Sequence, residues 1–100
     1  MSFDIIDFET LRILDTTVGI DIGASANTTA AQTEGRYHLA TTEYCHVKIT
    51  TAGTAATTSD GILAPGERLI YLGENDRVSC IQVSGGGTGV LRLTKAVIVR

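Results

Sequence analysis

The sequence contains no tryptophan, a single proline and only five aromatic residues among its one hundred. Val, Ile, Leu and Ala must therefore supply most of the core, packed around the few aromatic rings that the chain has. Side chains of this size suit the narrow space between two packed layers of secondary structure. A single domain of this length buries roughly two thirds of the surface that its unfolded chain exposes, so a core can form without cross-links.

Basic residues are few and dispersed. Eight Lys and Arg, from Arg12 to Arg100, stand against eleven Asp and Glu, giving a net charge of −3. Nucleic acid binding depends on grouped Lys and Arg, so this distribution argues against a nucleic acid partner. No apolar run reaches the roughly 18 residues that a membrane-spanning helix needs. The opening residues, MSFDIIDFE, are acidic where a secretory signal is basic, so we expect a soluble protein made in the cytoplasm, with no membrane partner.

The two cysteines, Cys45 and Cys80, fall in separate apolar runs, and no Cys-x-x-Cys or Cys/His spacing accompanies them. A disulfide framework is not needed in a chain that can build its own core. We therefore predict two free, buried thiols.

From residue 43 onward, short β-rich runs alternate with Gly, Pro, Asn, Asp and Thr at intervals of about 8 to 12 residues, which is typical of a sandwich or barrel. Pro65-Gly66 and the segment 73–76 are predicted turns. The stretch VSGGGTGVL at 83–91 would need a following helix to cradle phosphate, and a β-rich run follows instead. We predict that it is a flexible hairpin connection.

Alternation within the runs favours antiparallel strands with one buried face. Cys45, Val47 and Ile49 share one face of their strand and are predicted to lie in the core, together with Val78 and Leu93. The run VSCIQV has no clearly polar face, which predicts a central strand covered on both sides.

The first fifteen residues fit a helical period nearly as well as a strand. We favour an extended arm that leads into the first strand, with residues 1–16 forming arm and first strand and residues 17–100 forming the β-sandwich domain. The segment TVGIDIG is predicted to be a strand that ends at Gly23.

No residues with catalytic, cofactor-binding or metal-binding spacing stand out. Cys45 and His46 are adjacent in a predicted strand, so they point to opposite faces and cannot share one ion. His38 and His46 are interpreted as surface or rim positions. The acidic residues of the arm and of Glu74-Asn75-Asp76 lack the spacing of a calcium loop, and Ser59 and Ser84 have no activating base in a recognisable motif. We therefore predict that the protein is not an enzyme and carries no cofactor.

The order of segments, from VGIDIGASANTTAAQTEGRYHLATTEYCHVKI through TAATTSDGILAPGERLIYL to NDRVSCIQVSGGGTGVLRL, resembles a family of small virion proteins of tailed bacteriophages. The resemblance covers residues 17–94 and leaves out the arm and the tail AVIVR. The matching positions are Tyr37, Leu39, Ala40, Thr41, Cys45, Val47, Ile49, residues 58–60 and 63–66, Asp76, Val78 and residues 81–84.

The resemblance implies an all-β protein: a single antiparallel, jelly-roll-like β-sandwich of about eight short strands, with an N-terminal arm. It implies a capsid decoration or cement protein, found on the virion after assembly in the host cytoplasm, whose partners are the major capsid protein or other virion proteins. Apolar side chains near a chain end need a covering surface, so the arm is the expected interface with the capsid or with other copies in a homotrimer. The interface residues are predicted to be Phe3, Ile5, Ile6, Phe8 and Leu11.

Three alternatives remain at this stage. The protein could instead belong to the neck, collar, tail or fibre attachment of the same particle. A carbohydrate-binding sandwich would need exposed aromatic residues, which are scarce here, and a hydrolase would need a paired acid and base.

Overall fold

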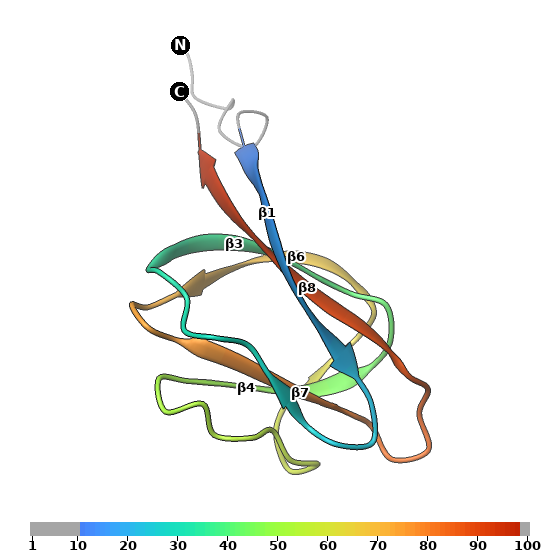
Figure 1. Cartoon of the computed structure of the whole chain (residues 1–100). Helices are drawn as coiled ribbons and strands as arrows, with labels where there is room; N and C mark the ends of the chain where they lie inside the picture. Colours follow the sequence, from blue (N-terminus) through green and yellow to red (C-terminus); the bar gives the residue numbers. More distant parts are fainter. Residues whose placement is uncertain (1–10, 99–100) are drawn as a thin grey trace.

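The computed structural model describes the backbone of residues 11–98 and the side chains of residues 17–96. This part of the chain forms two antiparallel four-stranded sheets packed as a sandwich (Figure 1). It contains no helix, and so none long and apolar enough to cross a membrane. The strands are β1 (Leu11–Ile22), β2 (Asn27–Thr28), β3 (Gly35–Thr41), β4 (Cys45–Thr50), β5 (Ile62–Leu63), β6 (Gly66–Leu72), β7 (Arg77–Gln82) and β8 (Gly89–Ile98).

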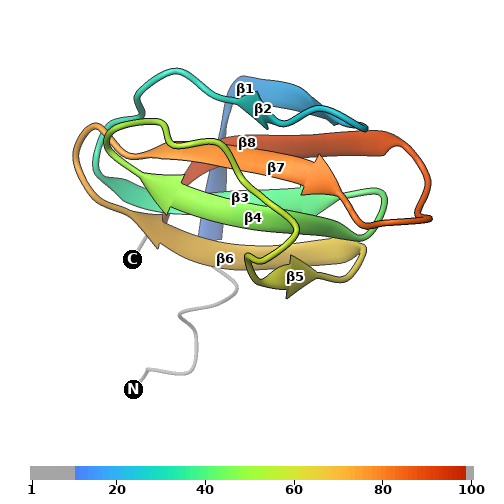
Figure 2. The same ribbon diagram turned by 90° about the horizontal axis from the view of Figure 1, so that it is seen from below.

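The strand order gives the sandwich a jelly-roll topology. One sheet, called sheet A here, has the order β1-β8-β3-β6, and the other, sheet B, has the order β2-β7-β4-β5. Successive strands change sheet at every connection except that between β4 and β5, as in two interlocked Greek keys. The edge strands β6 and β5 lie along the same side of the molecule (Figure 2). The predicted all-β sandwich of about eight strands is confirmed.

The glycine-rich stretch is a bend, as predicted, but it is not a hairpin. It joins β7 in sheet B to β8 in sheet A, so it crosses between the layers. The crossing begins with a tight turn in which Gly86 N donates to Val83 O at 2.8 Å and Gly85 has a φ of 77°. Glycine adopts that left-handed conformation more readily than any other residue. Residues 87 and 88 then carry the chain to the other sheet, which a hairpin would not require.

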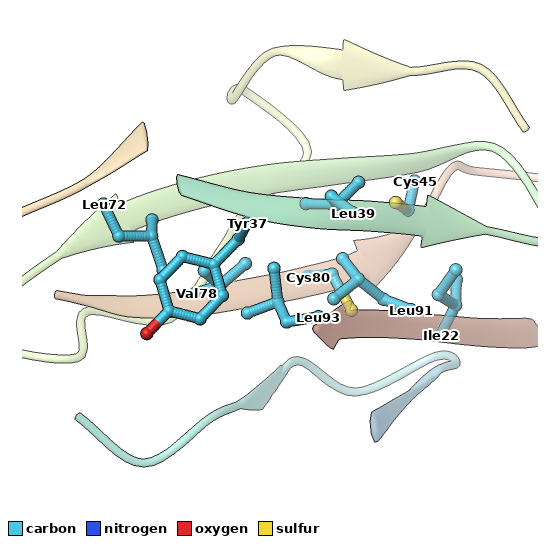
Figure 3. Packing of buried hydrophobic residues seen from close by; sticks show 9 residues of the cluster. All are labelled: Ile22, Tyr37, Leu39, Cys45, Leu72, Val78, Cys80, Leu91 and Leu93. Atoms are coloured by element: carbon cyan, nitrogen blue, oxygen red, sulfur yellow. The ribbon is translucent and has the colours of Figure 1, made fainter. Parts of the chain in front are cut away.

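The inner faces of the two sheets form the core (Figure 3). The cross-strand pair Leu39↔Leu93 lies on the inner face of sheet A, and the pair Val47↔Cys80 lies on the inner face of sheet B. The buried cluster comprises Ile22, Tyr37, Leu39, Cys45, Leu72, Val78, Cys80, Leu91 and Leu93. Aliphatic side chains and the two cysteines, with the single ring of Tyr37, fill this cluster without tryptophan, as the composition predicted.

Most of the predicted core positions are confirmed, and one is wrong. Cys45 and Val78 are fully buried, Leu93 is 1% exposed, and Val47 is half-buried against the cluster. Ile49, however, is 39% exposed. It is the second-last residue of β4 and lies outside the buried cluster. Alternation placed Ile49 on the correct face, but it could not show where along the strand the core ends.

Strand β7 is central and covered on both sides, as predicted. Val78, Ser79 and Cys80 are all fully buried, although successive side chains point to opposite faces. The cover on the outer face comes from the loop 51–61, whose Ala56 is 3% exposed and donates its N–H to Ser79 Oγ at 2.8 Å. We call this segment the covering loop.

The covering loop also corrects the prediction for His46, which is 6% exposed rather than at the surface. Its Nδ1 lies 2.8 Å from the carbonyl oxygen of Asp60, at the end of the loop. The Asp60 carboxylate pairs with Lys48 at 3.4 Å, and Val47 N donates to Gly61 O at 3.0 Å. The loop is therefore fixed along β4 by three contacts.

Replacing Ser79 with alanine should lower the free energy of unfolding by about 1 to 3 kcal/mol, because a buried donor that loses its acceptor pays its full desolvation cost. The donor is Ala56 N, and Ser79 Oγ also accepts from Thr28 Oγ1 at 3.0 Å. Urea denaturation followed by circular dichroism measures the loss. Ser59→Ala, at an exposed loop position, is the matched control and should change stability little. Equal effects of the two substitutions would contradict the assigned role of Ser79.

Candidate interaction surface

The outer faces of the two sheets differ. The covering loop lies over β7 and β4 in sheet B, whereas no described segment is bonded over the outer face of sheet A. Residues in register on adjacent strands share one face, so the outer face of sheet A can be read as rows across β1, β8, β3 and β6. The rows contain Thr17, Thr94, His38 and Leu69; then Gly19, Arg92, Ala40 and Glu67; then Ala96, Arg36 and Tyr71. We call this set of residues the open face.

Where the open face is formed by described side chains, it has two hollows, both open to solvent. The larger, of about 490 Å³, is lined by Thr17, Gly19, His38, Ala40, Arg92 and Thr94. It exists because Gly19 and Ala40, the cross-strand neighbours of Arg92, carry little or no side chain. The smaller, of about 310 Å³, is lined by Arg36, Leu69, Ile70 and Tyr71 at the β6 edge.

Large apolar side chains are exposed along this edge. Leu69 is 51% and Tyr71 60% exposed, and Ile62 of the neighbouring edge strand β5 is 58% exposed. A soluble domain carries scattered apolar residues normally, but a group along one edge marks a surface that another molecule can cover. Among the described strands, β6 pairs on one side only, with β3, so it is an edge strand of sheet A.

The charges of the open face are divided between paired and unpaired groups. His38 Nε2 lies 2.7 Å from Glu67 Oε1, and the Tyr71 hydroxyl donates to Glu34. This bond to Glu34 raises the pKa of Tyr71. Arg36 and Arg92 are exposed, and neither forms an ion pair with any side chain in the described range 17–96. The open face therefore offers two cationic groups beside apolar ones.

Of the five predicted interface residues, the structure describes only the backbone of Leu11. Phe3, Ile5, Ile6 and Phe8 lie outside the described residues. Leu11 is the first residue of β1 and pairs with Ile98 of β8. This pair lies beyond Ala96, the last residue of β8 that pairs with β3. The predicted boundary after residue 16 falls where the β1 register shifts, between Ile13 and Thr17, but β1 continues across it as one strand.

Several of the side chains that the sequence analysis considered as catalytic or metal-binding candidates pack in the core or form hydrogen bonds within the fold. Cys45 points into the core while His46 lies under the covering loop, on opposite faces of β4 as predicted. Asp76 accepts from Gly73 N at 2.8 Å and closes the predicted turn. His38 is bonded to Glu67 on the open face. Within the described residues, no three His, Cys, Asp or Glu side chains come together as a metal site.

Both thiols are free and fully buried, which confirms the sequence prediction. Burial raises the pKa of Cys45, an effect that the nearby Arg68 partly offsets. Burial, with smaller contributions from Cys45 and Asp21, raises the pKa of Cys80 to about 12. The thiolate is the reactive form, so both cysteines are inert in the folded protein.

We expect iodoacetamide to leave both cysteines unmodified in the native protein and to modify both in denaturant without reductant. Mass spectrometry of the intact protein and of its peptides makes the comparison. Modification of either thiol in the native state would contradict their burial. A linked Cys45–Cys80 peptide would contradict their free state.

Sequence reasoning missed the open face. In β6, GERLIYL, the outward Leu69 and Tyr71 alternate with the inward Ile70 and Leu72, so the second half of the strand is apolar on both faces. Alternation alone could not say which face is exposed. Comparison with protein-family models, with curated proteins and with solved structures finds no match to this chain.

Proposed function

We propose that the protein is a structural, non-catalytic component of a tailed-bacteriophage particle, bound in many copies to the outside of the head, where it stabilises the shell. The observation that carries the proposal is the ordered resemblance between residues 17 and 94. The resemblance implied a jelly-roll-like sandwich, and the strand orders β1-β8-β3-β6 and β2-β7-β4-β5 agree with it. The fold supports the proposal only in this respect, because one fold serves many functions.

Such a role would act through binding alone. A protein that binds the assembled shell, and not its separated subunits, stabilises the assembled state by mass action. Many copies with modest interfaces reinforce one another, because each contact raises the effective concentration of the next. The proposed partners are the major capsid protein and other copies of this chain, in a closed homo-oligomer that we propose is a trimer. The open face and the arm would provide the contacts.

The packing of the two sheets supports the open face as a contact surface. The inner face of each sheet is used by the core, and the outer face of sheet B is used by the covering loop. The open face, with Leu69 and Tyr71 exposed at its edge and two arginines that form no ion pair within residues 17–96, offers both apolar and cationic groups to a partner.

The proposal is tested with phage particles that lack the protein. They should assemble, but they should release their genome at lower temperature and under milder chelation or osmotic shock than complete particles. Adding the purified protein back should restore resistance, and bovine serum albumin at the same concentration is the control. A position at the neck, collar, tail or fibre attachment predicts the opposite pattern: shell resistance would be unchanged, while tail joining or adsorption would fail.

A further inference from the structure

We propose that the acidic arm, residues 1–10, of one copy docks on the open face of a second copy. The inference deepens the proposed function and rests on it for the setting, in which many copies lie side by side on one shell. Three observations carry it: where the charge of the chain resides, what the open face offers, and where the arm begins.

The net charge of the chain resides in its arm. Residues 1–10, MSFDIIDFET, include Asp4, Asp7 and Glu9 and no Lys or Arg. All eight basic residues of the chain, and the other eight acidic ones, fall between residues 11 and 100. The body is therefore formally neutral, and the arm accounts for the whole charge of −3. An acidic segment favours a cationic docking surface, which steers association and suppresses wrong contacts.

The open face has the complementary chemistry. Arg36 and Arg92 are exposed and form no ion pair in the described range, while Glu67 is bonded to His38 and Glu34 to Tyr71. Among the side chains of residues 17–96, the carboxylate of Asp21, on the outer side of β1 next to the open face, lines neither hollow. Within residues 17–96, the carboxylates of this side of sheet A are thus bonded to other groups or lie outside the hollows.

The apolar groups match as well. The arm interleaves acidic residues with Phe3, Ile5, Ile6 and Phe8. The smaller hollow places the exposed Leu69 and Tyr71 directly beside Arg36, which is the cross-strand partner of Tyr71. Aromatic and aliphatic anchors in a hollow, with charge pairs around them, are the usual source of binding energy in protein interfaces.

The position of Leu11, where the arm joins β1, favours docking on the open face of a second copy. The arm precedes Leu11, which pairs with Ile98 at the end of a two-stranded ribbon of β1 and β8. Strand β3 stops pairing with β8 at Ala96, and the ribbon extends beyond the rest of the sandwich (Figure 1). Strand β1 is also the edge of sheet A opposite to β6, where the apolar hollow lies. The arm therefore joins the fold at the edge of sheet A opposite to its own apolar hollow, which favours the hollow of a second copy as its docking site.

The test uses charge reversal in the full-length chain. The face variant is Arg36→Glu/Arg92→Glu, the arm variant is Asp4→Lys/Asp7→Lys, and Arg77→Glu on the outer face of sheet B is the control. Circular dichroism and thermal melting verify that each variant folds. Sedimentation velocity at low and high salt then measures self-association.

We expect the face variant and the arm variant each to weaken self-association by about tenfold or more, because each places like charges together. Arg77→Glu should associate like the wild type. Mixing the two variants should restore association, since each arm then meets a face of opposite charge on the other chain. Salt should weaken the association of the wild type, because the proposed contacts are solvent-exposed.

Three results would overturn the inference: a wild type that stays monomeric, a face variant that associates like the wild type, or variants that do not associate when mixed. The last result would show that the arm binds its own chain or another surface. The same proteins are then added to particles that lack the protein. If wild type protects the shell while any of these three results holds, the docking inference fails and the proposed function stands. If wild type gives no protection, the proposed function fails whatever the association measurements show.

Discussion

Replacing Leu93 with alanine should lower the free energy of unfolding by about 3 kcal/mol, because removing a buried leucine side chain loses its transfer energy and leaves a cavity. Leu93 is 1% exposed and lies on the inner face of β8, between Val18 of β1 and Leu39 of β3. Strand β8 is interior to sheet A, so little backbone movement can fill the gap. Urea denaturation followed by circular dichroism gives the difference.

Leu69→Ala is the matched control, because the same atoms are removed from a position that is 51% exposed. We expect a loss of less than about 1 kcal/mol there. If the two substitutions were equally costly, the assignment of inner and outer faces of sheet A would be wrong. The comparison therefore tests the register of the sheet and not only the existence of a core.

Raising the pH should destabilise the protein strongly, and Cys80 should account for much of the loss. Its pKa is raised to about 12 in the fold from an ordinary value of 9.0, chiefly by burial. Between these two values the unfolded chain has released the proton while the folded chain keeps it, so stability falls as pH rises. Below the pKa of the thiol in the unfolded chain, the thiol is neutral in both states, so its ionisation does not lower the free energy of unfolding. Each unit of pKa difference corresponds to about 1.4 kcal/mol.

The contribution of Cys80 is isolated by comparing wild type with Cys80→Ala across pH 8 to about 12. The variant should be less stable at pH 8 because it loses a buried sulfur, but its stability should fall less steeply above pH 9, the ordinary thiol value. Tyr and Lys titrate in both proteins and cancel in the difference. Parallel curves for the two proteins would show that Cys80 does not retain its proton in the fold.

Turn chemistry and alternation predicted the sandwich. The period of two placed Cys45 and Val47 on the core face, and the absence of a polar face in VSCIQV predicted the doubly covered β7. Neither signal contains information about which sheet a strand joins. The glycine-rich connection was therefore expected to form a hairpin, and the structure shows that it crosses between the sheets.

Long-range packing explains what the sequence could not provide. The covering loop is rich in Ala and Thr, and no local pattern predicts that Ala56 is buried against Ser79. Without that knowledge, His46 was expected at the surface. The open face was missed for a related reason. Sequence alternation does not distinguish a sheet face that packs against the core from one that is exposed to solvent.

Location within the purified phage particle, by electron cryo-microscopy, is the measurement that tests the proposed function most directly. The decoration proposal predicts a jelly-roll density in many symmetry-related copies on the head exterior, contacting neighbouring capsid subunits. Labelled antibody against the protein should decorate the same surface. Density for the protein in a few copies at the neck, tail or fibre attachment, with a bare head surface, would contradict the proposal.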